Sequence, residues 1–309
     1  MKLKSEEITI ETTNICPARC QICPREQFNQ KLGIMDFGLF KKIINDAAQY
    51  NVKSIDTAGF GEPFADKLFF KRCEYIRQKL PKAEIYVSST CFLMTPDMYD
   101  NVIKYIDILK ISIYGATEGT YEKCHGGSLK FEKTISNTLG FLEKIKELEK
   151  KPYTIGLMTI TDDNKHELQD WVKFWEPKLD EIYVWKPHNW AGARNYRTVD
   201  YKKVMSCGRP FNGPLYIHID GTVSMCCFDF NKQLVIGDIK KQTIYEILHS
   251  DSFQKLKKAH EEKNFKGYLC EKCCQINPDN SVLVYASNKE RKVGRLNPNL
   301  KDLEIIKKI

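Results

Sequence analysis

The stretch Cys16-Pro-Ala-Arg-Cys20-Gln-Ile-Cys23 places three cysteines on one short segment, with three and then two residues between them. It follows residues 8–11, whose β-branched apolar side chains predict a strand. Three thiolates on one tight loop can bind three irons of a 4Fe-4S cube and leave the fourth iron for another ligand. Zinc is the alternative, although it normally takes four protein ligands, often from Cys-x2-Cys pairs.

Outward from this loop, short β-branched runs alternate with longer helical patterns. The strands are expected at 8–11, 54–57, 84–88, 108–113, 154–160 and 181–185. The helices are expected at 36–49, 65–80, 96–105, 131–150 and 165–175, with Asp36 and Thr95 at N-cap positions. This repeat predicts a parallel sheet or barrel of the α/β class.

The pattern changes near Gly208. Residues 216–225 predict a hairpin with Asp220-Gly221 at its turn, and residues 244–258 predict an amphipathic helix. We therefore expect a barrel domain at 1–204, a small α+β domain at 205–282 and a polar tail at 283–309.

Composition narrows the class of protein. The chain has 309 residues, of which 42% are hydrophobic and 28% charged, and this excludes disorder. The net charge of +8 comes from scattered lysines that predict a solvated surface and no nucleic-acid partner. The sequence has no apolar signal segment and no long apolar run, so we expect a cytoplasmic protein without a membrane partner. Twelve cysteines in that setting favour metal binding or catalysis over disulfides.

The C-x3-C-x2-C loop resembles that of the radical S-adenosylmethionine (radical SAM) enzymes. Together with the βα repeat, the resemblance implies a partial (β/α)6 TIM-like barrel. The resemblance implies that Cys16, Cys20 and Cys23 bind a catalytic 4Fe-4S cluster whose open iron binds S-adenosylmethionine. One electron, supplied by a reducing partner such as flavodoxin or ferredoxin, then cleaves this cofactor to a 5′-deoxyadenosyl radical. The radical takes a hydrogen atom from the substrate.

Further segments resemble the family's cofactor-binding motifs. Gly59-Phe-Gly61-Glu62-Pro63 resembles the Gly-Gly-Glu motif, of which Gly61 and Glu62 carry over. Two segments at the ends of the third and fourth strands, which begin at Ser88 and Ser112, resemble those that line the ribose and methionine parts of the cofactor. In the second of them, Tyr114 stands where the family commonly has Asp. Asn164 is a cofactor contact or the N-cap of the next helix.

These residues share a physical pattern, because each lies at or just past the end of a predicted strand. In a parallel βα fold such ends lie on one face, where sites are built. The last of them is the segment 186–197, where Lys186 and His188 are candidate catalytic groups and Arg194 is a candidate for binding the cofactor carboxylate. The alternative for this segment is a linker packed by Trp190 and Tyr196.

The small domain has its own cysteines, which resemble those of the SPASM and twitch auxiliary-cluster domains. The four-cysteine version implies that Cys207, Cys226, Cys270 and Cys273 bind a second 4Fe-4S cluster. Zinc bound by the same four residues is the alternative. Three roles stay open for their neighbours Cys227 and Cys274: either residue could replace a ligand, remain free or contact substrate.

Other cysteines lie outside both sets. Cys73 falls within a predicted helix and is expected in the core. Cys91 and Cys124 are expected on loops at the active face. There they are candidate hydrogen-atom donors to a substrate radical, together with Cys227, or they have no special role.

The resemblance implies an oxidoreductase of dehydrogenase or epimerase type. Only 15 residues precede Cys16, so we expect no N-terminal domain for a peptide leader. One auxiliary cluster in a compact chain resembles enzymes that act on sugars and aminocyclitols, and the substrate is expected to be such a small polar molecule. The alternatives are a peptide- or protein-modifying maturase and a non-catalytic iron-sulfur or zinc protein.

Overall fold

The computed structural model describes residues 5–277 and 282–287. The chain folds into two compact units. The first unit comprises Met1–Cys16, Glu26–Tyr86 and His188–Pro278. The second comprises Pro17–Arg25, Val87–Pro187 and Asp279–Ile309.

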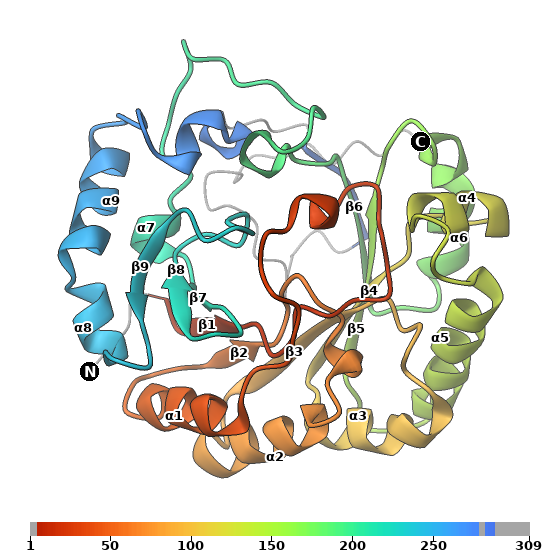
Figure 1. The fold of residues 1–309 in the computed structure, drawn as a ribbon. Helices are drawn as coiled ribbons and strands as arrows, with labels where there is room; N and C mark the ends of the chain where they lie inside the picture. The colour runs from red at the N-terminus through yellow and green to blue at the C-terminus, as the bar shows by residue number, and fades with distance from the viewer. Residues whose placement is uncertain (1–4, 278–281, 288–309) are drawn as a thin grey trace. The chain divides into compact units, whose positions relative to one another are not determined.

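The sheet of the first unit combines parallel and antiparallel strands (Figure 1). The strands are β1 (Glu7–Ile10), β2 (Ser54–Asp56), the first half of β3 (Glu84–Ser89), β7 (Leu215–Ile217), β8 (Thr222–Ser224) and β9 (Val235–Asp238). Their order is β3-β2-β1-β7-β8-β9, with parallel pairing from β3 to β7 and antiparallel pairing from β7 to β9. The predicted hairpin is confirmed as β7 and β8, and Gly221 at its turn has the positive φ of 88° that favours glycine.

The helices of the first unit are α1 (Phe37–Ala47), α2 (Phe69–Lys79), α7 (Arg209–Asn212), α8 (Ile244–Leu248) and α9 (Asp251–Glu261). Side chains cap the starts of α1, α8 and α9, whereas α2 and α7 have no side-chain cap bond. Asp36 caps α1 as predicted, because its carboxylate accepts from the Leu39 N–H at 2.8 Å. The single helix predicted at 244–258 is wrong. Ser250 accepts from the Phe253 N–H and starts a second helix, so the segment is divided into α8 and α9.

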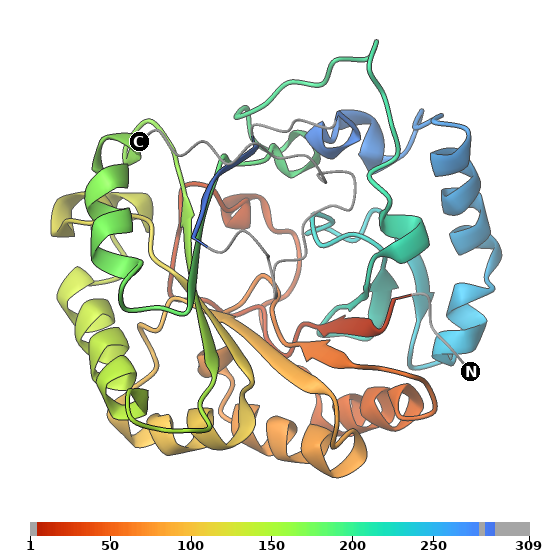
Figure 2. The ribbon, with the colours of Figure 1, turned by 180° about the vertical axis from the view of Figure 1, so that it is seen from behind.

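The second unit is a βα arrangement. Its strands are the second half of β3, β4 (Ile108–Ser112), β5 (Tyr153–Thr159), β6 (Glu181–Trp185) and β10 (Leu283–Ala286), in the order β10-β6-β5-β4-β3. Its helices are α3 (Tyr99–Tyr105), α4 (Glu118–Cys124), α5 (Phe131–Ile145) and α6 (Leu168–Trp175). Figure 2 shows α3, α5 and α6 on the outer side of these strands, where Phe141, Trp171 and Trp175 are buried. The predicted alternation of strands and helices is confirmed.

Three details of the second unit differ from the predictions. Thr95 precedes a short 3₁₀ turn but makes no side-chain cap bond. Helix α5 ends at Ile145, earlier than predicted, because the charged residues that follow contribute no buried face. Helix α4 was not predicted, since it has only seven residues and includes Gly119.

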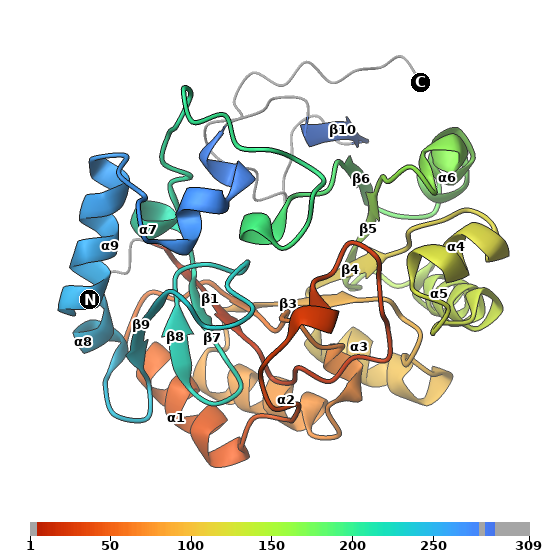
Figure 3. The ribbon, with the colours of Figure 1, turned by 45° about the horizontal axis from the view of Figure 1, so that its top comes forward.

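Strand β10 lies in the segment that was expected to be a polar tail. It pairs antiparallel with β6, with Leu283 opposite Trp185, and Figure 3 shows the two strands together. The Ile182 N–H donates to the Ser287 Oγ at 2.9 Å, which extends the pairing by one residue. The rest of the predicted tail, 288–309, lies outside the described residues.

Among the described residues, no helix is long and apolar enough to cross a membrane.

Candidate functional site

Two predicted site segments lie at one edge of the first unit. Cys16 follows β1, and Gly61 and Glu62 follow β2. Because β1 and β2 are parallel, the loops that carry these residues leave the same edge of the sheet.

Gly61 lies against the backbone of the chain that leads to the cysteines. A Cβ atom at this position would stand 2.2 Å from the Thr13 carbonyl oxygen and 2.9 Å from that of Ile15. The next residue completes the contact, since the Glu62 N–H donates to the Ile15 carbonyl oxygen at 2.9 Å. Glycine is therefore required at position 61, and the Glu62 side chain is buried beside it.

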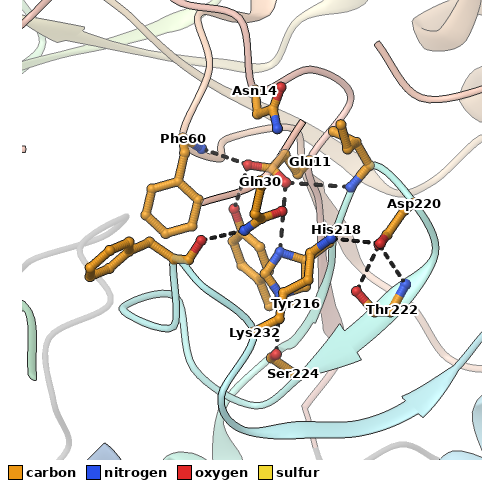
Figure 4. A network of polar contacts seen from close by, with 12 residues as sticks. Glu11, Asn14, Gln30, Phe60, Tyr216, His218, Asp220, Thr222, Ser224 and Lys232 are labelled. Atoms are coloured by element: carbon orange, nitrogen blue, oxygen red, sulfur yellow. Dashed lines mark hydrogen bonds and ion pairs between the residues drawn. The ribbon is translucent and has the colours of Figure 1, made fainter. Parts of the chain in front are cut away.

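Glu11, at the end of β1, is a buried carboxylate that organises this loop (Figure 4). Its Oε1 accepts from the Phe60 N–H at 3.0 Å and from the Tyr216 hydroxyl at 3.3 Å. Its Oε2 accepts from the Ile219 N–H at 3.4 Å and lies 3.6 Å from His218 Nδ1. The sequence pattern places Glu11 only in a strand. A charged residue that ends an apolar strand just before the cysteines was the signal available.

The network continues through the hairpin. His218 Nε2 lies 3.1 Å from the Ser224 Oγ, and Ser224 donates to the Asp229 Oδ2 at 3.1 Å. Asp229 also accepts from the Gln233 and Leu234 N–H groups at 2.6 and 2.7 Å. These buried polar groups link the loop that carries Gly61 and Glu62 to the segment that carries the C-terminal cysteines.

The long loop after β1 is held by its own side chains in the first unit. Asn14 donates to the Lys31 carbonyl oxygen at 3.0 Å and accepts from the Gly33 N–H at 2.7 Å. Arg194 forms a two-bond ion pair with Glu26, and its Nη2 donates to Glu26 Oε2 at 2.7 Å. The hydrogen bond to Arg194 lowers the pKa of Glu26.

In the second unit, Cys20 and Cys23 lie against the end of α4. The Cys23 N–H donates to the Cys20 carbonyl oxygen at 2.9 Å and closes a turn. The Cys20 Sγ lies 3.1 Å from Nδ1 of His125. Burial lowers the pKa of His125 to about 3, so its ring is neutral. Sequence reasoning missed His125, because 105 residues separate it from Cys20.

The remaining strand-end residues lie where they were predicted. Ser88 is in β3, Ser112 ends β4, and Lys186 follows β6 and is exposed. The parallel pairing of β4, β5 and β6 brings the last residues of these strands to one edge of the second unit. The ring of Tyr114 packs beside this edge, where burial first and the Cys20 thiol second raise its pKa.

Asn164 is buried and makes no side-chain cap bond to the turn that follows it. Its amide instead donates to the Tyr114 and Thr159 carbonyl oxygens at 3.1 and 3.0 Å, and its Oδ1 accepts from the Thr161 N–H at 2.6 Å. The N-cap alternative is thus wrong for its side chain. Asn164 joins the ends of β4 and β5.

Cys91 and Cys124 were both expected on loops. Cys91 is on one and is fully buried, with a positive φ of 59°, and its carbonyl oxygen accepts from Asn137 at 3.0 Å. Cys124 is instead the last residue of α4 and is buried. Burial raises the pKa of the Cys124 thiol to about 11, which keeps its S–H bond at neutral pH.

The C-terminal cysteines gather around Arg209 in the first unit. Arg209 Nη2 donates to the Cys227 Sγ at 3.1 Å, and the pKa of Arg209 is raised by Cys227 first and then by Cys226 and Cys207. Burial first and Cys207 second raise the pKa of Cys270 to about 12. Burial also raises the pKa of Cys273, with smaller contributions from Cys274, Cys207 and Cys270.

The second members of the two cysteine doublets have different partners. Cys227 accepts from Arg209, whereas Cys274 Sγ accepts from the Asn189 N–H at 3.2 Å and its own N–H donates to Asn189 Oδ1 at 2.9 Å. His188, next to Asn189, stacks on Phe228 with ring centroids 3.9 Å apart. Burial lowers the pKa of His188 to about 3.

No group of three or more Cys, His, Asp or Glu residues within 5–277 and 282–287 is placed to bind one metal ion. This geometry is compatible with iron-sulfur cubes, because each cysteine of a cube binds its own iron and the sulfurs do not converge on one point.

Two family models match the chain. Residues 10–174 match the Radical SAM superfamily, and residues 207–274 match SPASM, an iron-sulfur cluster-binding domain. The first match covers more than half of the chain and the second covers all six C-terminal cysteines.

Known proteins resemble the chain at low identity. The crystal structure of BtrN in complex with AdoMet and 2-DOIA has a TM-score of 0.64 and 20% identity, over 88% of this chain and 94% of that one. Streptococcus suis SuiB bound to precursor peptide SuiA also has a TM-score of 0.64, with 14% identity over 88% of this chain and 70% of that one. These likenesses confirm the α/β barrel-like fold.

A curated relative matches over a shorter stretch. The tungsten-containing aldehyde ferredoxin oxidoreductase cofactor-modifying protein of Pyrococcus furiosus is 26% identical over 106 residues. That match covers 34% of this chain and 29% of the relative, so the chain spans less than a third of the length of that protein.

The two family models imply S-adenosylmethionine, a 4Fe-4S cluster and auxiliary iron-sulfur clusters. The described residues fit these groups in two respects. The three cysteines of the N-terminal loop are partly exposed, as an iron with an open coordination position requires. The thiols of Cys270 and Cys273 have raised pKa values, and iron cations would favour their ionised form.

Proposed function

The chain belongs to the radical SAM superfamily, and we propose that it oxidises or epimerises a small polar, sugar- or cyclitol-like substrate. When bound, the catalytic cluster and S-adenosylmethionine supply a 5′-deoxyadenosyl radical that takes a hydrogen atom from a substrate carbon. The chain's own residues hold the cofactors, orient the substrate and move its proton and second electron.

We propose that Cys16, Cys20 and Cys23 bind the catalytic cluster. The S-adenosylmethionine contacts are proposed at Gly61, Glu62, Ser88, Ser112, Asn164 and Arg194. The position of Gly61 supports this set, because its missing Cβ leaves space against the backbone just before Cys16. Asn164 joins two strand ends and would act by fixing the loop that carries Tyr114.

The observation that carries the oxidation proposal is the gathering of the C-terminal thiols around Arg209. We propose that Cys207, Cys226, Cys270 and Cys273 bind a second 4Fe-4S cluster. The Arg209 cation lies beside them and would stabilise the extra negative charge of a reduced cluster. Removal of a hydrogen atom from a hydroxyl-bearing carbon, and of the proton from its hydroxyl group, leaves one electron, which this second cluster would accept as the carbonyl forms.

Lys186 and His188 are the proposed groups for substrate binding and proton removal. Lys186 is exposed just past β6, whereas the His188 ring is neutral because burial lowers its pKa to about 3. A neutral imidazole can accept a hydrogen bond from a substrate hydroxyl.

Epimerisation would need a thiol to return a hydrogen atom from the opposite side. Cys91, Cys124, Cys227 and Cys274 are the candidates, and the raised pKa of Cys124 keeps its S–H bond intact. When the four are replaced one at a time, loss of the cysteine that acts as donor should abolish product while 5′-deoxyadenosine still forms. Retention of product by all four variants would exclude the epimerase version.

The alternative function is modification of a peptide or protein. The likeness to SuiB, which was solved with its precursor peptide, favours this alternative. The likeness to BtrN, which was solved with AdoMet and 2-DOIA and aligns over 94% of its chain, favours the small substrate.

The partition of the chain into 1–204, 205–282 and 283–309 is part of the proposal, supported by the two family matches at 10–174 and 207–274. So is a reducing partner such as flavodoxin or ferredoxin. A cytoplasmic location is proposed as well, because a reducing compartment keeps cysteines available to bind clusters.

The test is substrate-stimulated 5′-deoxyadenosine formation by the anaerobically reconstituted chain, with a panel of aminocyclitols, sugars and short Ser- or Cys-containing peptides. Stimulation by a cyclitol or sugar, with one oxidised product per 5′-deoxyadenosine, is expected. Stimulation by peptides alone would replace the proposal with the maturase alternative.

A further inference from the structure

The side chain of His125 lies against the cysteine loop within the second unit. Its Nδ1 atom is 3.1 Å from the Cys20 Sγ, and the residue is fully buried. We infer that His125 is a positioning residue that donates an N–H hydrogen bond to the Cys20 thiolate. This bond sets the orientation of the ligand and the reduction potential of the catalytic cluster. The inference rests on the proposed role of Cys20 as a cluster ligand.

The contact made by the other ring nitrogen, Nε2, indicates which nitrogen of His125 carries the hydrogen. The Tyr114 N–H donates to His125 Nε2 at 3.4 Å, so Nε2 acts as an acceptor. A ring whose Nε2 accepts a hydrogen bond carries its hydrogen on Nδ1. The Nδ1–H group therefore faces the Cys20 sulfur.

Two aromatic rings fix the plane of the imidazole. The Tyr114 ring is parallel to it, with centroids 4.9 Å apart and an interplanar angle of 2°. The Tyr121 ring packs with its centroid 4.3 Å away, tilted by 39°. Packing against both rings restricts rotation of the His125 side chain, so its Nδ1–H group keeps pointing in one direction.

Backbone contacts fix the distance between His125 and Cys20. The Arg19 N–H donates to the His125 carbonyl oxygen at 3.2 Å, and the Gln21 N–H donates to the Cys124 carbonyl oxygen at 2.9 Å. These two bonds flank Cys20 in the sequence, so its position relative to the end of α4 is set from both sides.

Gly126 allows this close approach. It has a positive φ of 70°, and a Cβ atom there would stand 2.2 Å from the Arg19 carbonyl oxygen. The end of α4 thus fits the cysteine loop as closely as the backbone permits.

A donor at this place affects the cluster in a definite direction. Reduction adds negative charge to the cube and its thiolates, and a hydrogen bond to a thiolate stabilises the more negative state more strongly. The His125 bond therefore raises the reduction potential and makes reduction by a given donor easier. Partners that orient metal ligands in this way commonly also affect affinity for the metal.

The experiment is a potentiometric titration of the anaerobically reconstituted full chain. The signal followed is the part of the reduced-cluster EPR spectrum that changes when S-adenosylmethionine is added, which separates the catalytic cluster from any auxiliary one. In His125→Leu, the ratio of reduced to oxidised cluster at a fixed potential should fall about tenfold, or 59 mV for a one-electron couple.

Two variants provide the matched comparison. His125→Asn keeps an N–H donor at the δ position and should restore most of the potential. Tyr121→Phe changes the packing around α4 but leaves the Nδ1–H group in place, so it should titrate like the wild type.

The outcomes separate this inference from the proposed function. Retention of the S-adenosylmethionine-sensitive signal in Cys20→Ala would mean that Cys20 is not a ligand. Loss of that signal, together with a wild-type midpoint in His125→Leu, would overturn the role of His125 alone. If the Leu variant does not fold, His125→Gln replaces it. The amide N–H of Gln lies one atom farther from the backbone than Nδ1 of His, so it does not reproduce the hydrogen bond. Equal midpoints for the Asn and Gln variants would then also overturn the inference.

Discussion

The two cysteine groups of this chain are held in different ways. The N-terminal group occupies eight residues of sequence and its thiols are partly exposed. Backbone contacts and His125 position it. The C-terminal group is drawn from 68 residues. Its first three cysteines are partly exposed as well, but Cys270, Cys273 and Cys274 are buried, and the Arg209 cation lies nearby. The difference suits the two proposed tasks, since a partly exposed loop leaves an iron accessible to a cofactor and a more buried set favours storage of an electron.

The largest expected effect is on the exposed group. Replacement of Cys16, Cys20 and Cys23 by Ala should abolish 5′-deoxyadenosine formation and lower iron from about eight to about four per chain, because one of two 4Fe-4S cubes is lost. Iron and labile sulfide analysis measures this. A wild type with about four irons and a variant with none would show that the C-terminal group is not a cluster site and would end the comparison.

The second largest effect is expected at Gly61, which lies against the backbone just before the exposed group. Gly61→Ala should displace the backbone near Thr13, lower the free energy of unfolding by about 3 kcal/mol and lower activity about a hundredfold. Thermal unfolding and S-adenosylmethionine cleavage measure the two effects. The control is Gly119→Ala in α4, where a Cβ meets nothing within 4 Å and should be neutral or slightly stabilising. Equal effects of the two substitutions would contradict the close approach at Gly61.

Arg209 tests the buried group. Arg209→Gln removes the cation next to the Cys227 sulfur and should lower formation of oxidised product about tenfold, because the second cluster then accepts an electron less readily. Release of 5′-deoxyadenosine should stay near the wild-type level, and Arg209→Lys should restore part of the product. A parallel loss of product and 5′-deoxyadenosine would mean that the two groups do not have separate tasks.

Glu11 precedes the first group in the sequence and binds the loop that carries Gly61, so its substitution sharpens the comparison further. Glu11→Gln keeps one acceptor oxygen but turns an amide toward donors, and we expect a loss of about 2 kcal/mol in stability and weaker S-adenosylmethionine binding. Tyr216→Phe removes only the hydroxyl bond and should cost about 1 kcal/mol. Urea unfolding with a binding titration measures both variants, and equal losses would contradict a central role for the carboxylate.

The smallest effect is expected at the surface of the hairpin. Burial alone would raise the pKa of Asp220, but the Lys232 ammonium and the Thr222 hydrogen bonds lower it to about 2. Because the pKa of Asp220 is lower in the folded state than in the unfolded state, its ionised form stabilises the fold at pH values above about 4. This stabilisation is lost as the pH falls toward 2.

Lys232→Met should therefore lower stability by less than about 1 kcal/mol at pH 7, because the Asp220 side chain is 45% exposed. The difference from the wild type should shrink below pH 4. Urea unfolding of the metal-free chains across this range measures it. A difference that grows toward low pH would contradict the assigned pKa direction.

Sequence alone predicted most of the strands, because each strand is a short β-branched run between turn residues. The bounds of β6, Glu181–Trp185, are those predicted. One error came from a local cap that the hydrophobic periodicity did not reveal, because the Ser250 side chain divides a helical pattern in two. Another came from a tertiary contact, since Leu283–Ala286 become a strand where β6 offers them an edge.

The candidate site shows the same limit. The cysteine loop and Gly61 carry local signals, namely a spacing and a motif. His125 and Glu11 carry almost none, since the contacts that distinguish them join residues 105 and 49 positions apart in the chain. The roles of the predicted site residues stay predictions until the variants above are measured.

Strand β10 also has a consequence for biosynthesis. It covers the outer edge of β6, an apolar strand whose unpaired N–H and C=O groups would otherwise be a template for other chains. Residues 283–287 leave the ribosome about a hundred residues after β6, so the edge of β6 is unpaired for that part of translation. A nascent chain stopped before residue 283 should therefore aggregate more readily than one stopped after residue 287.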